Sequence, residues 1–317
     1  MKAAIVQGAG QPPVYGVFSD PVAGEGECIV TVTAAAISHV VKGRAFGAHY
    51  SSSGKFPFVV GIDGVGRLED GRRVYFLMPS APFGSMAERA VVPVSRCLPL
   101  PDALDDVTAA AIANPGMSSW AAYTERAKFR VGETVVVNGA TGTSGRLAIQ
   151  IARYLGAGKV IAVARNAEAL KSLPALGADV TIALGDDEAA LDAALKEQFA
   201  EGVDVVIDYL WGKSAERLIA AGARHGKGAM PIRYVQVGSM SAGDITLPSA
   251  ALRSSAIELM GSGIGSIPLE RLVQAVDGLL QATVPGGFQI ASTVVPLSQV
   301  EQAWPRDDST RRTVFTI

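Results

Sequence analysis

The sequence predicts an α/β protein that combines a mostly β unit with a doubly wound parallel sheet. Its 317 residues are 49% hydrophobic and 18% charged and include 35 glycines, which fits a tightly turned globular chain with two compact cores. Residues 2–92 contain short β-like runs bounded by glycine and proline. From residue 134 onwards, apolar runs alternate with helical segments at the pitch of βαβ units. These observations together indicate the fold class.

The first third of the chain and the segment after it differ in the secondary structure that they predict. Strands are predicted at residues 2–6, 28–36, 58–66, 74–78 and 88–92. Helical spacing follows at 107–112 and 117–126, with an interruption at Asn114-Pro115-Gly116. We place a domain junction at this interruption, so that residues 1–114 form the first part of one domain and residues 115–254 form another.

The second domain is predicted from its alternating elements. Strands are expected at 134–138, 160–164, 180–183, 203–208 and 233–237, and helices at 144–155, 167–176, 187–199 and 214–223. The strands are continuous apolar runs, as a parallel sheet covered on both faces requires.

Residues 255–317 contain extended runs at 257–260, 292–296 and 313–317 and helices at 269–280 and near Val300. Because this tail has too few elements for a core of its own, we expect it to return to the first domain.

Charge and hydropathy exclude several kinds of partner. The formal net charge of -2 is spread without runs, so the sequence predicts neither nucleic-acid binding nor attraction to an anionic membrane. The N-terminus is typical of a strand rather than a signal peptide, and no stretch of about 18 apolar residues follows. Cys28 and Cys97 lie far apart in apolar contexts, which favours two thiols in a reducing cytoplasm over a disulfide.

A glycine-containing turn joins the strand at 134–138 to the helix at 144–155. Ala140 stands where a tight turn needs a small residue, Gly142 would let the backbone approach a pyrophosphate, and Gly145 would let the helix pack close to the strand. Backbone N–H groups at the helix start would face the anion. The turn predicts a dinucleotide site formed by Asn138, Ala140, Thr141, Gly142, Thr143, Ser144 and Gly145.

The end of the next strand predicts which dinucleotide is bound. Arg165 stands 20 residues after Gly145, where an acidic residue would bind the ribose hydroxyls of NAD. A guanidinium can bind a 2′-phosphate, and the missing carboxylate removes a repulsion. The expected cofactor is therefore NADPH.

Several segments, in this order and spacing, resemble the medium-chain dehydrogenase/reductase superfamily, specifically its zinc-free quinone oxidoreductase branch. They are Met1 to Ala4, Val32 to Ser38, Phe56 to Gly66, Ala113 to Trp120, Ala140 to Gly145 and Leu176 to Asp179. The resemblance covers nearly the whole chain. It implies a GroES-like catalytic domain built from both chain ends, with a Rossmann domain inserted between them.

Residue chemistry argues against a metal in this chain. Metal-binding relatives have a cysteine where Ser38 stands and a His-Glu pair where Ile62-Asp63 stands, and the four-cysteine structural lobe is missing. His39 and His49 have no cysteine companions at matching spacing. We therefore expect no zinc, and an acceptor that delocalises the incoming electrons itself, such as a quinone or an α,β-unsaturated carbonyl.

The resemblance also implies further site residues. It places the loop that contains Tyr50 beside the nicotinamide, where the hydroxyl could polarise a substrate oxygen or the ring could only pack; His39 is a lesser catalytic candidate. The remaining implied cofactor-binding residues are Ser38, Lys42, Ser118, Gly238, Ser239 and Met240.

Other functions remain open. Carbonyl reduction or enoyl-thioester reduction by NADPH is one alternative, and an NADPH-binding redox sensor without turnover is another, since no strong acid/base pair is visible. The extended Ser255 to Met260 segment corresponds to the strand through which relatives often pair, so a homodimer is expected.

Overall fold

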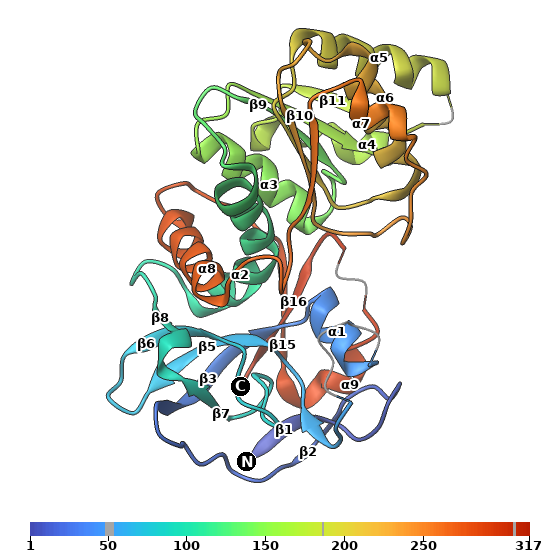
Figure 1. The fold of residues 1–317 in the computed structure, drawn as a ribbon. Helices are drawn as coiled ribbons and strands as arrows, with labels where there is room; N and C mark the ends of the chain where they lie inside the picture. The colour runs from blue at the N-terminus through green and yellow to red at the C-terminus, as the bar shows by residue number, and fades with distance from the viewer. Residues whose placement is uncertain (48–53, 186, 307–308) are drawn as a thin grey trace. The chain divides into compact units, whose positions relative to one another are not determined.

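The computed structural model describes residues 1–47, 54–185, 187–306 and 309–317. The chain divides into two compact units (Figure 1). Met1–Pro115 and Val276–Ile317 together form what we call the split unit, and Gly116–Ala275 form the central unit. Within the described residues, no helix is both long and apolar enough to cross a membrane.

The split unit consists mainly of two sheets. In the first sheet the strands follow the order β2 (Val14–Val17), β1 (Lys2–Val6) and β4 (Phe58–Val59). In the second the order is β15 (Ser292–Pro296), β16 (Arg312–Thr316), β3 (Glu27–Ala36), β5 (Asp63–Leu68), β6 (Arg73–Leu77) and β8 (Cys97–Pro99), and β7 (Arg89–Pro93) also pairs with β3. The helical segments are α1 (His39–Ala45), α9 (Val300–Ala303) and the 3-10 turns Val94–Arg96 and Leu297–Gln299.

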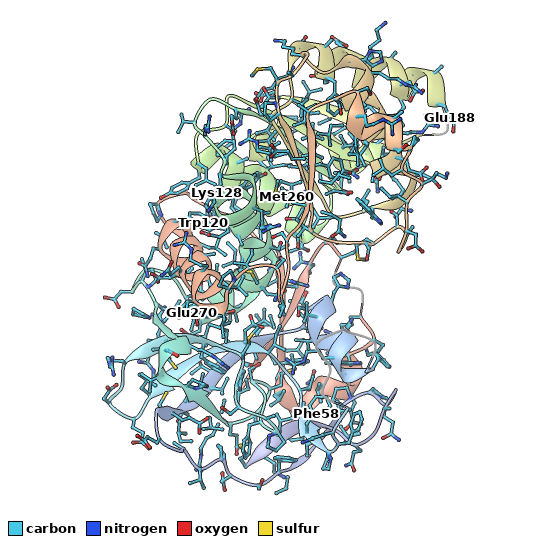
Figure 2. The ribbon with its side chains drawn as sticks, viewed as in Figure 1. Phe58, Trp120, Lys128, Glu188, Met260 and Glu270 are labelled. Carbon is cyan, nitrogen blue, oxygen red and sulfur yellow. The ribbon has the colours of Figure 1, made fainter. Side chains whose placement is uncertain are left out.

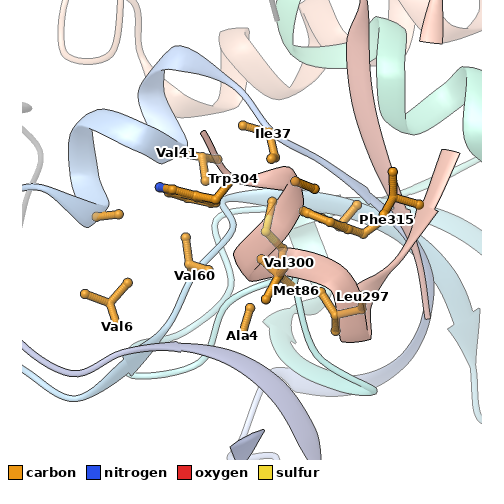
Figure 3. Close-up of a cluster of buried hydrophobic side chains, with 14 of the residues drawn as sticks. Ala4, Val6, Ile37, Val41, Val60, Met86, Leu297, Val300, Trp304 and Phe315 are labelled. Carbon is orange, nitrogen blue, oxygen red and sulfur yellow. The ribbon is translucent and has the colours of Figure 1, made fainter. Parts of the chain in front are cut away.

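One buried cluster explains why both chain ends belong to the split unit. Figure 3 shows Val41 of α1 and Val60 near Trp304, with Ala4 from the first strand and Phe315 from the last in the same cluster. All five side chains are at most 4% exposed. Because β16 also pairs with β3, the tail obtains its core from the N-terminal segment.

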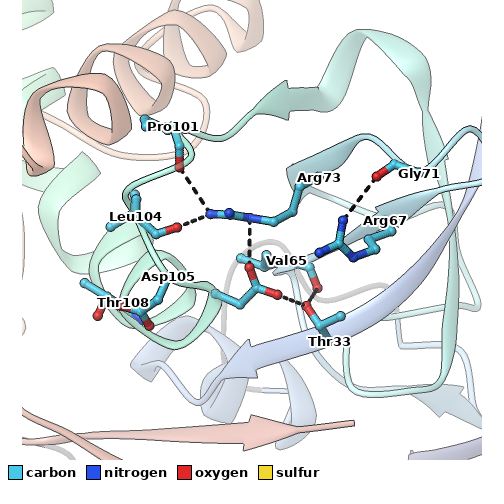
Figure 4. A network of polar contacts seen from close by, with 10 residues as sticks. Thr33, Val65, Arg67, Gly71, Arg73, Pro101, Leu104, Asp105 and Thr108 are labelled. Carbon is cyan, nitrogen blue, oxygen red and sulfur yellow. Dashed lines mark hydrogen bonds and ion pairs between the residues drawn. The ribbon is translucent and has the colours of Figure 1, made fainter.

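A partly buried arginine fixes the start of α2 (Asp106–Ala121) on the split unit's sheet (Figure 4). Arg73 on β6 forms an ion pair with Asp106 at 2.9 Å and donates to the carbonyl oxygens of Pro101 and Leu104. Asp106 also accepts a hydrogen bond of 2.6 Å from Thr33 on β3. The network satisfies a guanidinium that would be costly to bury unpaired.

The central unit contains a sheet in which every described pairing is parallel. Its order is β11 (Val180–Ala183), β10 (Lys159–Ala164), β9 (Thr134–Asn138), β12 (Val205–Asp208), β13 (Ile232–Gln236) and β14 (Ile257–Gly261). The helices are α3 (Thr143–Tyr154), α4 (Ala167–Leu170), α5 (Glu188–Glu201), α6 (Gly212–His225) and α7 (Ser249–Arg253), with a π-helical turn at Ala122–Ala127 and a 3-10 turn at Pro174–Leu176. Helix α8 (Leu269–Thr283) follows β14. The predicted doubly wound sheet is confirmed.

Helices cover this sheet as the apolar strands require. Leu195 and Phe199 of α5 and Leu218 of α6 pack with Val136 and Ile161 of the sheet in one buried cluster. In Figure 1, α5, α6 and α7 lie together on one side of the sheet and α3 lies on the other. The order reverses at β9, because the chain moves from β9 to β10 on one side and later returns to β12 on the other. Ligands of such folds bind at the carboxyl ends of the strands at this reversal.

Three local predictions differ from the structure. The interruption expected at Asn114-Pro115-Gly116 is wrong, because α2 runs through Pro115. The alanines that precede it are buried, so packing outweighs the missing hydrogen bond. The helix expected at 167–176 ends at Leu170 and continues as a separate 3-10 turn from Pro174, whose nitrogen carries no hydrogen. The run at 58–66 is divided into β4 and β5 around Gly61, which has a φ of 109°.

The boundary between the central unit and the C-terminal part of the split unit differs from the expected one. The expected boundary follows residue 254, whereas the compact units divide after Ala275. The reason is β14, which pairs in parallel with β13 from Ile257 to Gly261 and so extends the central sheet.

Candidate nucleotide-binding site

The carboxyl ends of β9, β12 and β13 bring three segments of the central unit together. The amide of Tyr209, which follows β12, donates to the carbonyl of Asn138 at 3.0 Å. The amide of Met240, which follows β13, donates to the carbonyl of Tyr209 at 3.1 Å. Asn138, the glycine turn and the Gly238 to Met240 segment therefore lie along one edge of the sheet, as the sequence predicts from their positions after successive strands.

The glycine turn is closed so tightly that side chains are excluded at one position. A Cβ atom on Gly145 would lie 2.2 Å from the carbonyl oxygen of Gly139 and 2.7 Å from the Cα of Ala140. Gly139 itself has a φ of 90°, which favours glycine. Ala140 is fully buried. Helix α3 thus begins directly against the end of β9, in the arrangement that the spacing of small residues indicates.

The start of α3 is suited to an anion. Its N-cap residue is Gly142, and no side chain within the described residues caps the helix at this position. The first turn is formed by Thr143, Ser144 and Gly145 and contains no acidic residue. Because the first N–H groups of a helix have no partner inside it, and the helix dipole is positive at this end, a phosphate is the favoured ligand.

Arg165 follows β10, the strand next to β9 in the sheet. Its side chain is exposed, and among the described residues it has neither a hydrogen bond nor an ion pair. Asn166, the following residue, caps α4 by accepting from the amide of Ala169 at 3.0 Å. The position leaves the guanidinium accessible to a phosphate in solution or on a nucleotide.

A buried polar network holds the end of β9 to the end of β12. The amide nitrogen of Asn138 donates to Asp208 at 2.7 Å and to the hydroxyl of Ser214 at 2.9 Å. Asp208 also accepts from the hydroxyl of Tyr234 at 2.8 Å and from the backbone amide of Leu210 at 2.8 Å. Burial raises the pKa of Asp208 above its usual value, and the hydrogen bonds that the carboxylate accepts offset only part of this rise.

The network gives Asn138 a structural task. Its side chain is fully buried and its amide nitrogen has two protein partners, while its Oδ1 has none among the described residues. A direct role of this side chain in cofactor binding stays a prediction. Asp208 is a residue that sequence reasoning did not select, although its position at the end of a predicted strand beside the turn was visible.

Tyr209 was also missed. Its hydroxyl lies 3.3 Å from the hydroxyl of Ser118, which the resemblance implies as a cofactor-binding residue. Tyr209 is 8% exposed, and burial raises its pKa to about 12, so it stays protonated at neutral pH. The carbonyl of Tyr209 also lies 3.0 Å from the position that a Cβ on Gly238 would occupy. Tyr209 therefore connects Ser118 with the Gly238 to Met240 segment, of which Ser239 and Met240 are exposed.

The remaining predicted residues belong to the split unit. Ser38 is the N-cap of α1, where its hydroxyl accepts from the amide of Val41 at 3.2 Å. His39 begins the helix and is exposed, and Lys42 donates to the carbonyl of Arg306 at 2.7 Å. Tyr50 and His49 lie outside the described residues. The catalytic roles of Tyr50 and His39 and the cofactor contacts of Ser38 and Lys42 stay predictions.

The residues that replace zinc ligands have other partners. Ser38 is 2% exposed and caps α1. Asp63 is 3% exposed and accepts from the hydroxyl of Tyr75 at 2.8 Å. Burial raises the pKa of Asp63 to about 6. Within the described part of the chain, no three His, Cys, Asp or Glu side chains gather closely enough to hold a metal ion.

Comparisons with known proteins agree with this architecture. The family model of zinc-binding dehydrogenases matches residues 145–281. A probable NADPH-dependent quinone reductase of Emericella nidulans is 32% identical, with 98% of each chain covered. A quinone oxidoreductase of Rattus norvegicus is 29% identical over 76% of this chain and 70% of its own. The structure of a quinone oxidoreductase from Thermus thermophilus, described also in complex with NADPH, superposes with a TM-score of 0.81 at 29% identity, covering 100% of both chains.

These likenesses, together with the fold, define the class of protein. The chain belongs to the medium-chain dehydrogenase/reductase superfamily, in its quinone oxidoreductase-like branch. It is an oxidoreductase.

Proposed function

We propose that the chain is an NADPH-dependent reductase that transfers hydride to a quinone or an α,β-unsaturated carbonyl without zinc. The observation that carries this proposal is the uncapped start of α3 beside the closed glycine turn, with exposed Arg165 after the neighbouring strand. The first would bind a pyrophosphate and the second a 2′-phosphate. The names of the relatives from Emericella nidulans and Thermus thermophilus support the same cofactor.

The residues present fit this cofactor. A side chain at Gly145 would overlap the backbone of the turn, and Gly142 has no side chain to occupy the start of α3. The nicotinamide would supply the hydride. The protein would contribute orientation, through the turn and Arg165, and exclusion of water from the reacting atoms. Ser118, held near the protonated hydroxyl of Tyr209, is a candidate hydrogen-bond donor on the same unit.

The proposed independence from zinc is supported by donor chemistry. Catalytic zinc needs three good protein ligands and an open position. Ser38 offers a hydroxyl that already caps a helix, Ile62 offers no ligand atom, and Asp63 already accepts from Tyr75. Without a Lewis acid, the developing negative charge must be spread by the acceptor, which favours quinones and enones over simple ketones.

A test of the cofactor and the acceptor uses rapid mixing of the purified chain with NADPH or NADH. Hydride transfer would be followed by nicotinamide absorbance across a panel of quinones, enones, ketones and enoyl thioesters. The proposal expects fast oxidation of NADPH by quinones or enones, undiminished by a chelator. Preferential turnover of ketones or thioesters would favour the alternative reductases. Tight NADPH binding without turnover of any acceptor would favour a redox sensor.

We further propose that the protein is a homodimer and that it acts on a small electron-poor acceptor. We also propose that it is located in a reducing cytoplasm. The edge position of β14 in the central sheet supports pairing between two copies. Cys28 and Cys97 are both free thiols with sulfur atoms 3.5 Å apart, as a reducing compartment would keep them.

A further inference from the structure

The split unit contains a cavity of about 560 Å³ whose described lining comes from that unit alone. The described walls come from Val41 and Arg44 of α1 with Gly47 after it, from residues 54–62, and from residues 79 and 81–83. Its volume is within the range of about 300–1,000 Å³ that small-molecule sites occupy. The glycine turn and Arg165 belong to the central unit and are not among the described residues of the lining.

The lining combines aromatic rings with positive charge. Phe56, Phe58 and Phe83 contribute rings, and Phe58 is labelled in Figure 2. Arg44 and Lys55 contribute cations, and no Asp or Glu is among the described residues of the lining. A ligand that complements these walls is flat, largely apolar and negatively charged at one end.

Arg44 has no counterion among the residues that the structure describes. It is half-buried on the last turn of α1, and no described residue forms a hydrogen bond or an ion pair with its guanidinium. Burial lowers the pKa of Arg44. Lys42, two residues earlier on the same helix, does have a partner, the carbonyl oxygen of Arg306. A partly desolvated guanidinium without a partner is costly, and a bound anion would offset the cost.

The walls of the cavity are already fixed. A Cβ on Gly84 would lie 2.1 Å from the carbonyl oxygen of Val59, and the amide of Val59 donates to the carbonyl of Pro82 at 2.9 Å. Residues 79–83 are thereby held against the β4 segment. Val41 and Val60, which also line the cavity, belong to the buried cluster of Figure 3. A site built on a packed core loses little conformational freedom when a ligand binds.

We propose that this cavity binds an aromatic carboxylate, with the rings against Phe56, Phe58 and Phe83 and the carboxylate on Arg44. The proposal goes beyond the reductase function and does not depend on it, because every described residue that it uses lies in the split unit. A planar guanidinium matches a carboxylate with two parallel hydrogen bonds, which an uncharged analogue cannot accept in the same way.

The probe is 2-naphthoate, titrated calorimetrically into the full chain with and without saturating NADPH. The expected result is saturable binding in both conditions. Arg44→Met should weaken it by about tenfold or more, the loss of one charge-assisted contact. Arg44→Lys should retain part of the affinity. The matched control is Arg224→Met, which changes an exposed arginine of the central unit and should leave binding unchanged.

A second measurement on the unaltered chain keeps the proposal testable should an Arg44 variant fold poorly. The neutral 2-naphthalenemethanol should bind about tenfold or more weakly than the carboxylate, because it cannot form the ion pair. Equal affinity for the two compounds would overturn the proposal, as would an undiminished affinity in a folded Arg44→Met variant. Displacement of 2-naphthoate by NADPH with no effect of Arg44→Met would assign the binding to the nucleotide site instead.

Discussion

Arg165 carries the proposed preference for NADPH, because its guanidinium is exposed and has no partner among the described residues. Arg165→Gln should raise KM for NADPH by about tenfold or more, the effect of losing one charge-assisted contact to a phosphate. KM for NADH should hardly change. Steady-state kinetics with both nucleotides check this, with Arg224→Gln as the control. An unchanged ratio of the two KM values would contradict the assigned role.

The raised pKa of Asp63 should make the stability of the folded protein depend on pH. Burial raises the pKa of this carboxyl from 3.8 to about 6, against the hydrogen bond from Tyr75 and the charge of Arg312. The folded state thus binds the proton more tightly than the unfolded state. The resulting stabilisation, about 3 kcal/mol, is fully present below pH 3.8 and is lost as the pH rises through about 6.

Thermal denaturation of the parent chain and Asp63→Asn tests this dependence. The parent should gain stability relative to the variant between about pH 7.5 and about pH 5, because only the parent takes up the proton. The difference between the unfolding temperatures of parent and variant at a single pH does not test the prediction, because the variant also changes the surroundings of buried Arg312. The test is how this difference changes with pH. A midpoint difference that is constant over this range would refute the prediction.

At the scale of elements, the junction of β9 and α3 leaves no room for an added side chain. Gly145→Ala would place a Cβ 2.2 Å from the carbonyl oxygen of Gly139, so α3 must move away from the strand. We expect a loss of about 1–3 kcal/mol in stability and weaker NADPH binding. Calorimetric unfolding and nucleotide titration measure the two effects. Gly185→Ala is the control, because nothing lies within 4 Å of its added Cβ; equal behaviour of both variants would count against the close approach.

The βαβ elements were predictable from the sequence because each is a long apolar or amphipathic run with its own period. Helix α3 was expected at 144–155 and spans Thr143–Tyr154. Prediction from local sequence failed where contacts with residues far away in the chain determine the structure. Pro115 indicated a break, yet the buried alanines before it keep α2 continuous. Tyr209 and Asp208 were missed because their partners, Ser118 and Tyr234, are far away in the sequence.

At the scale of the whole molecule, the return of the tail could be predicted, but its starting point could not. The tail was too short for a core, and its last strand pairs with β3. The extended run at 257–260 carried no signal for its neighbour, since parallel pairing with β13 depends on the arrangement of the entire central sheet. The unit boundary after Ala275 is therefore a property of the assembled sheet.

The position of β14 also leads to a prediction about the assembled protein. In the described part of the central sheet, β14 pairs with β13 on one side and has no strand on the other. Such an edge favours pairing with a second copy, so sedimentation should give twice the mass of the chain. Gly261→Pro on β14 removes a backbone donor that faces away from β13 and should shift the protein towards monomer. Thr181→Pro on β11, the opposite edge, should leave the dimer intact. If Gly261→Pro stays dimeric while its circular dichroism is unchanged, the two copies associate through another surface.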